Sequence, residues 1–122
     1  DAGVDHILPL RSLLDAGVHV SLATDNVPPT MFVPIGHAVS RLTDAGEPLA
    51  PGQCISRLEA LACASREGAW LSFEEDSKGT IEVGRHADLA ILSDDLLEVD
   101  AERIPDITAD VTVTAGNVVH ER

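Results

Sequence analysis

A helix pattern that passes through a single glycine directly into a strand pattern is the feature that most constrains the fold of this chain. Residues 9–16 (PLRSLLDA) place their leucines on one helix face, and Gly17 follows as a helix stop. Residues 18–23 (VHVSLA) then alternate apolar and polar side chains, which predicts a strand. Such αβ steps build parallel sheets and (β/α) barrels, so we expect an α/β fold for the front of the chain.

Two more helices are predicted before the character of the sequence changes. Residues 34–42 predict a short helix. Residues 56–71 predict the clearest helix of the chain, with Ser56 and Glu59 as its capping box. The side chains expected on the apolar face of this helix are Leu58, Leu61, Ala62, Ala69 and Trp70.

The second part of the chain is rich in β-like runs. Strands are expected at residues 80–83, 87–92, 110–115 and 117–121. Residues 115–117 predict a hairpin turn, and residues 93–105 form a polar connection with little periodicity. We therefore expect a division near residue 76, with one domain over residues 1–76 and a second over residues 77–122.

Charge argues against two classes of partner. Twenty-one acidic residues face eight basic ones, for a net charge of −13. Nucleic acid and anionic membranes both attract basic patches, so neither is expected as a partner. Lys78 is the only lysine, a composition that fits either a salt-adapted organism or a GC-rich genome. The chain shows no signal-peptide pattern and opens on Asp1 rather than Met, so we expect a fragment or a processed chain.

Cysteines and histidines form no ready-made metal site. Cys54 and Cys63 show neither a metal-binding nor a disulfide pattern, which favours a reducing, cytoplasmic setting. No pair of histidines has the close spacing of a preformed metal site. The histidines are His6, His19, His37, His86 and His120.

The order of these pieces resembles the end of a known superfamily. Four stretches carry the resemblance, in the order LLDAGVHVSLATD (13–25), RLEALACASREGAWL (57–71), GTIEVGRHADLAILSDD (79–95) and VTVTAGNVVHE (111–121). The third stretch is similar to a G-x-I-x-x-G-x-x-A-D-L-x-x-L signature. The chain closely resembles the carboxyl-terminal part of the metal-dependent amidohydrolase superfamily. It is most similar to the subgroup that includes formamide deformylase-like enzymes.

This resemblance implies the last αβ unit or units of a (β/α)8 TIM-like barrel, followed by the carboxyl-terminal strands of a small composite β domain. That β domain is made jointly from the two ends of the full-length protein. The missing amino-terminal part of the same protein is therefore an expected partner. Exposed strand edges make a homo-oligomer the other expected assembly.

The resemblance assigns one chemical role within this chain. It maps Asp25 onto the last-strand aspartate, which contacts the metal site and acts as general base toward the water that the metal activates. The implied cofactor is one or two divalent metal ions, with zinc expected, and the metal-binding histidines lie on barrel strands outside this chain. The alternative interpretation is that Asp25 simply begins a turn ahead of Asn26 and Pro28.

The loop after Asp25 is expected to border the substrate pocket, as such loops do in barrels. The candidate pocket residues are Asn26, Met31, Phe32 and His37. Packing against neighbouring loops is the competing interpretation for the apolar ones. Asp88, despite its place in the signature, is expected to accept backbone N–H bonds in a tight turn rather than to take part in chemistry.

Two functions from different classes follow. The first is a fragment of a metal-dependent hydrolase that acts on a small-molecule substrate at a non-peptide C–N bond, amide or cyclic amide, and is inactive by itself. The second is a stand-alone β-rich interaction or scaffold module without catalysis. A barrel deaminase is a further alternative within the superfamily.

Overall fold

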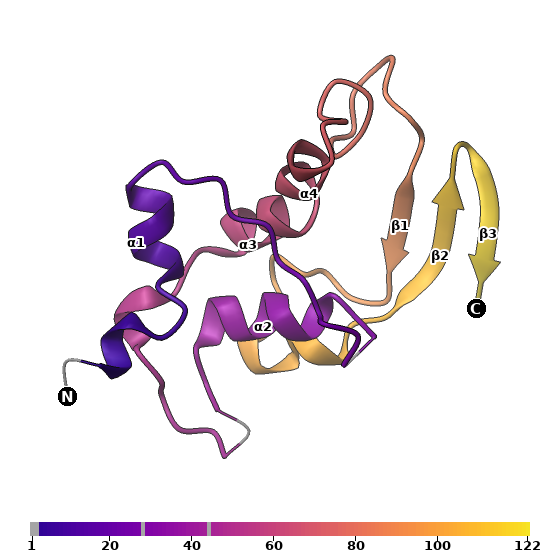
Figure 1. Ribbon diagram of the computed structural model, residues 1–122. Helices are drawn as coiled ribbons and strands as arrows, with labels where there is room; N and C mark the ends of the chain where they lie inside the picture. The colour runs from indigo at the N-terminus through magenta and orange to yellow at the C-terminus, as the bar shows by residue number, and fades with distance from the viewer. Residues whose placement is uncertain (1–2, 28, 44) are drawn as a thin grey trace.

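The computed structural model describes residues 3–27, 29–43 and 45–122, and it has an α/β fold with a small antiparallel sheet. Helices gather around α2, and the sheet projects at the carboxyl-terminal end (Figure 1). None of the described helices is long and apolar enough to cross a membrane. The elements in chain order are η1 (Val4–His6), α1 (Leu10–Asp15), α2 (Phe32–Ser40), η2 (Pro51–Gln53), α3 (Arg57–Ala64), α4 (Arg66–Leu71), β1 (Leu89–Leu92), η3 (Ala101–Asp106), β2 (Ala109–Thr114) and β3 (Asn117–Glu121).

The sheet has three antiparallel strands in the order β1-β2-β3. Ala115 and Gly116 join β2 to β3 with positive φ angles of 48° and 79°, which confirms the predicted hairpin turn. Asp88 and Ala87 hold this turn in place. Asp88 Oδ1 accepts the Ala115 N–H at 2.8 Å, and the Ala87 carbonyl accepts the Gly116 N–H at 3.0 Å. The structural role expected of Asp88 is confirmed.

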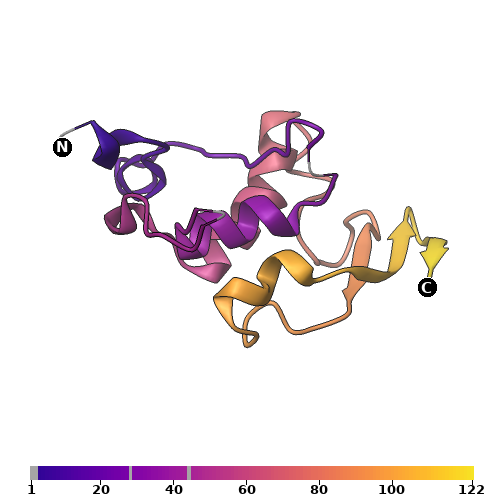
Figure 2. The same ribbon diagram turned by 90° about the horizontal axis from the view of Figure 1, so that it is seen from below.

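The core centres on the contact between α2 and η3, which lie side by side in both views (Figures 1 and 2). Gly36 of α2 faces the ring of Pro105 so closely that a Cβ atom on the glycine would meet Pro105 Cγ at 2.8 Å. Hydrophobic side chains from both parts of the chain fill the space around this contact. The buried core residues are Leu10, Ile35, Ala38, Ile55, Ala60, Cys63, Leu96, Val99, Ile104 and Ile107.

The segment expected to be a polar connection therefore supplies part of the core. Within residues 93–105, Leu96 and Val99 are buried and Ile104 is fully buried. Acidic residues separate these apolar ones, so the segment shows neither a period of two nor one of 3.6. The expectation was wrong because short 3-10 turns can bury isolated apolar side chains without a regular repeat.

The capping box at the start of α3 is confirmed. Ser56 Oγ accepts the Glu59 N–H, and Glu59 accepts the Ser56 N–H at 2.8 Å. The expected continuous helix is instead two helices, because Ser65 has non-helical angles of φ −130° and ψ −81°. The expected apolar face was also wrong in part, since Leu58 is 65% exposed whereas Ala60 and Cys63 are buried.

Two predicted strands are not strands in the structure. Residues 18–23 lack strand pairing, because a parallel strand takes its hydrogen bonds from neighbouring strands and the described chain provides none beside this segment. Residues 80–83 lie in a region of turns between Gly79 and Gly84, both at φ 92°. Arg85 closes these turns by donating to the carbonyls of Glu75 and Lys78.

The Gly36–Pro105 contact predicts a specific weak point in the core. We expect Gly36→Ala to lower the free energy of unfolding by ~1–3 kcal/mol, because the added methyl group overpacks a contact with a stiff ring. Urea unfolding of the purified protein measures this. Gly52→Ala is the matched control, since its Cβ would meet nothing within 4 Å. Equal stability of the two variants would contradict the prediction.

Candidate functional site

Asp25 lies in an exposed turn that follows residues 18–24. Asp25 and Asn26 have φ angles of 54° and 66°, and the Val27 N–H donates to the Thr24 carbonyl at 3.2 Å. Apart from glycine, Asn and Asp are among the residues that best tolerate this left-handed backbone. Among the residues that the structure describes, none forms a recorded hydrogen bond or ion pair with the Asp25 carboxylate. The backbone conformation at Asp25 therefore fits the interpretation that this residue lies in a turn. Its chemical role stays a prediction.

The structure separates the four candidate pocket residues. Asn26 is exposed beside Asp25. Met31 and Phe32 line a hollow of about 820 Å³ that faces β1, and both pack against the core. His37 borders a different hollow of about 460 Å³, together with Glu102 and Pro105. Asp25 lines neither of these two hollows.

The segment before Asp25 is held by the two helices α3 and α4. The Leu22 N–H donates to the Cys63 carbonyl at 3.0 Å. The Val20 and Leu22 side chains pack against the core, whereas Val18 is exposed. Residues 18–24 therefore dock on α3 and α4 through side chains and the backbone bond from Leu22 to Cys63 rather than through a strand partner.

His19 adds a polar contact between this segment and α4. Its Nδ1–H donates to Glu67 Oε2 at 2.6 Å, and its ring stacks on Trp70 with centroids 3.9 Å apart and planes 6° from parallel. Glu67 is buried and also pairs with Arg66 at 2.9 Å. The hydrogen bond from His19 lowers the pKa of Glu67 below its ordinary value, although burial opposes this effect.

The sequence pattern did not indicate a role for Glu67. Glu67 lies within the pattern of one continuous helix, and that pattern gives no indication of its contact with the segment before Asp25. The available signal was the pair Ser65 and Gly68, two poor helix formers close together within that helix pattern.

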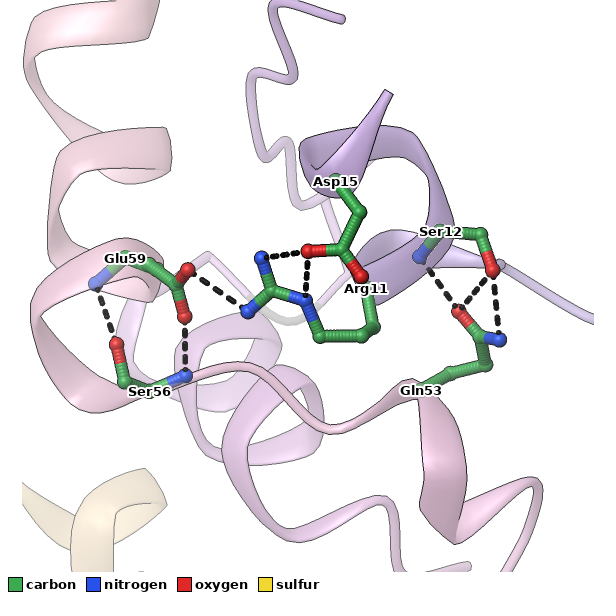
Figure 3. Close-up of polar contacts among 6 residues, drawn as sticks. All are labelled: Arg11, Ser12, Asp15, Gln53, Ser56 and Glu59. Atoms are coloured by element: carbon green, nitrogen blue, oxygen red, sulfur yellow. Dashed lines mark hydrogen bonds and ion pairs between the residues drawn. The ribbon is translucent and has the colours of Figure 1, made fainter. Parts of the chain in front are cut away.

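A second polar network fixes α1, the helix that leads into residues 18–24 (Figure 3). Arg11 donates from Nη1 to Glu59 Oε1 at 2.7 Å and from Nε to Asp15 Oδ1 at 2.9 Å. Glu59 is thereby shared between its capping box and α1. Backbone and side-chain hydrogen bonds from Ser56, together with the one from Arg11, lower the pKa of Glu59 to about 2. Nearby, Ser12 donates to Gln53 Oε1.

The described residues fit a divalent metal ion only in part. The exposed carboxylate of Asp25 is an oxygen donor of the kind that such ions accept. Within residues 3–27, 29–43 and 45–122, no three His, Cys, Asp or Glu side chains converge on one point. Asp25 therefore fits as one member of a ligand set whose other members would come from outside this chain.

Comparison with known proteins identifies the family. Residues 1–120 match a family described as "Amidohydrolase family", and the chain therefore belongs to it. One curated relative is an N-substituted formamide deformylase from Arthrobacter pascens, 34% identical over 119 residues, or 95% of this chain. The chain spans only 22% of that protein's length. No solved structure matches the chain.

The lowered pKa of Glu59 predicts a loss of stability in acid. Because the pKa falls from an ordinary value of 4.5 to about 2 on folding, the ionised carboxylate contributes stability that is present above pH 4.5. That contribution is lost as the pH falls through the folded value near 2. We expect the free energy of unfolding in urea to decrease over this interval, and Glu59→Gln to make the decrease smaller.

Glu98→Gln is the matched control for this measurement, because no ion pair of Glu98 is recorded in the described part of the chain. It should leave the slope of stability against pH close to that of the unaltered protein. An identical slope in the Glu59→Gln and Glu98→Gln variants would contradict the link between the network and acid stability.

Proposed function

We propose that this chain is the carboxyl-terminal part of a metal-dependent hydrolase that cleaves a non-peptide C–N bond of a small molecule. The match of residues 1–120 to the amidohydrolase family carries this proposal. The similarity to an N-substituted formamide deformylase supports an amide substrate, with N-substituted formamides as the first class to assay. The same proposal takes residues 1–76 as the end of a (β/α)8 barrel and residues 77–122 as part of a composite β domain.

Asp25 is the residue of this chain to which we assign chemistry. It follows directly on a segment held against α3 and α4, and its side chain is exposed in a turn. In barrels, the carboxyl ends of the strands carry the catalytic residues. We therefore propose that Asp25 binds the metal and acts as general base. Asn26, Met31, Phe32 and His37 remain proposed pocket residues.

The chemistry proposed for Asp25 is proton transfer. A divalent metal, when bound, lowers the pKa of a water molecule toward ~7 and so makes it a nucleophile at neutral pH. The Asp25 carboxylate accepts the proton as the carbonyl carbon is attacked, and then gives it to the leaving nitrogen. A short side chain at the end of a docked segment suits this task because it has few rotamers to lose.

We also propose that upstream residues of the same protein cover the apolar side chains that this chain leaves exposed. Phe73 is 89% exposed, and Ile81 and Val83 are 86% and 108% exposed. Of these, Ile81 is part of the wall of the hollow that Met31 and Phe32 line. β1 and β3 each have one partner in the described sheet, which leaves edges for further strands or for a second copy.

Asp25→Asn in the full-length protein tests the assignment. We expect kcat for N-substituted formamides to fall by at least ~10²-fold, since asparagine cannot accept the proton. Metal content measured on the purified protein should stay largely unchanged. Release of formate and amine, rather than ammonia, distinguishes amide hydrolysis from deamination.

Asp88→Asn is the matched control, because Asp88 holds the hairpin turn and has no assigned chemistry. It should leave kcat near that of the unaltered protein, and asparagine keeps an oxygen that can accept the Ala115 N–H. Near-normal turnover by the Asp25→Asn variant would remove Asp25 from the mechanism.

The 122-residue chain by itself should be inactive. Its described residues place no ligand cluster around Asp25, so a bound metal ion would lack most of its protein ligands. We expect no formate release from N-substituted formamides when the purified chain is supplied with zinc. Metal-dependent turnover above the background set by the Asp25→Asn variant of the same chain would refute this.

A further inference from the structure

The break between α3 and α4 frees a backbone acceptor for the segment that ends at Asp25. In an unbroken helix the Cys63 carbonyl would accept the N–H of Glu67, four residues on. Here it accepts the Leu22 N–H at 3.0 Å. Ser65 satisfies the two preceding carbonyls, with its Oγ donating to Leu61 at 2.7 Å and its N–H donating to Ala62 at 3.2 Å. The break thus exchanges an intrahelical bond for a tertiary one.

The first turn of α4 provides a second anchor on the same segment. The Glu67 carboxylate receives the His19 Nδ1–H at 2.6 Å, and the His19 ring lies flat on Trp70. The Glu67 side chain is only 10% exposed, so without His19 this poorly solvated carboxylate would keep Arg66 as its ion-pair partner but lose the bond at Oε2. Ser21 lies between the two anchors and faces Gly68, where a Cβ atom would be in ordinary van der Waals contact with Ser21 Oγ at 3.7 Å.

The anchors are connected to Asp25 by a short, turn-closed stretch of backbone. Leu22 precedes Asp25 by three residues, and the bond from Val27 to Thr24 closes the turn that contains it. The Asn26 N–H also donates to Thr24 Oγ1 at 3.2 Å. A displacement of the segment at the α3–α4 break would therefore move the Asp25 carboxylate with it.

We propose that the α3–α4 break positions Asp25 for reaction, with His19 and Glu67 as positioning residues and the Cys63 carbonyl as the backbone anchor. This inference rests on the proposed function of Asp25. Reacting groups must approach to within ~3–3.5 Å, and a misplacement of about 1 Å can cost ~10²-fold in rate. The anchors lie outside the reacting centre, so their loss should affect kcat more than KM.

His19→Phe in the full-length, metal-loaded protein is the main test. Phenylalanine keeps a flat ring on Trp70 and removes the bond to Glu67. We expect kcat for N-substituted formamides, per folded and metal-loaded site, to fall roughly tenfold, with KM changed by less than about twofold. Thermal unfolding and metal content, measured on the same samples, separate this effect from a loss of folded protein.

Three further variants make the test specific. Glu67→Ala removes the acceptor and should lower kcat as His19→Phe does. Glu67→Gln keeps an oxygen that can accept the Nδ1–H and should retain most of the kcat. Arg66→Ala removes the other partner of Glu67 but leaves the His19 bond intact, so we expect kcat near that of the unaltered protein. If Glu67→Ala does not fold, His19→Phe and Glu67→Gln carry the comparison.

The outcomes separate this inference from the proposed function. Unchanged kcat per folded, metal-loaded site in His19→Phe would overturn the positioning role, even if thermal stability fell. A loss of kcat in Arg66→Ala as large as in His19→Phe would overturn it as well, because a general loss of charge around Glu67 would then explain both. Asp25→Asn is assayed in parallel, and full activity in that variant would overturn the proposed function itself.

Discussion

The contact between Gly36 and Pro105 is the constraint on which the rest of the structure depends. It brings α2 within reach of η3 and lets Ile35 and Ala38 meet Ile104 and surrounding apolar side chains in one core. With two phenylalanines and one tryptophan in 122 residues, the chain fills this space with aliphatic side chains. Aliphatic side chains bury less area per residue than aromatic ones. The backbones must therefore approach closely for the core to be densely packed. A glycine opposite a proline ring is what permits that approach.

Polar contacts then determine where the helices end and what they touch. The shared carboxylate of Glu59 caps α3 and pairs with Arg11 of α1, so one residue both starts a helix and fixes a second one. At the other end of α3, Ser65 ends the helix and releases the Cys63 carbonyl. Both features satisfy helix-end groups that would otherwise lack partners. They also decide where residues 18–24 lie, since α1 leads into that segment and α3 receives it.

Local patterns predicted the elements whose hydrogen bonds are local. The capping box at Ser56 and the turn at Ala115 are sequence-adjacent arrangements, and the structure confirms both. The pattern of residues 18–23 is that of a strand, but strand pairing needs neighbours that the described chain does not provide. Ile104 was missed for the opposite reason, because its burial depends on α2, which lies 64 to 72 residues earlier in the chain (104 − 40 and 104 − 32), and leaves no periodic pattern.

For the candidate site too, the sequence indicated some features and not others. Its proposed position rests on a resemblance, since the Thr24-Asp25 pair after an alternating segment is similar to the end of the last barrel strand in the superfamily, and the family match over residues 1–120 supports that proposal. Its chemistry was not readable from local physics, since Asp25 sits in a turn that any Asp-Asn pair would favour and its carboxylate is solvent-exposed. A general base must also lie within hydrogen-bond reach of the proton that it accepts. The described residues leave the Asp25 carboxylate exposed, so under the proposed function the groups that enclose it would come from elsewhere in the full-length protein, and what this chain contributes is the carboxylate and the framework that holds it.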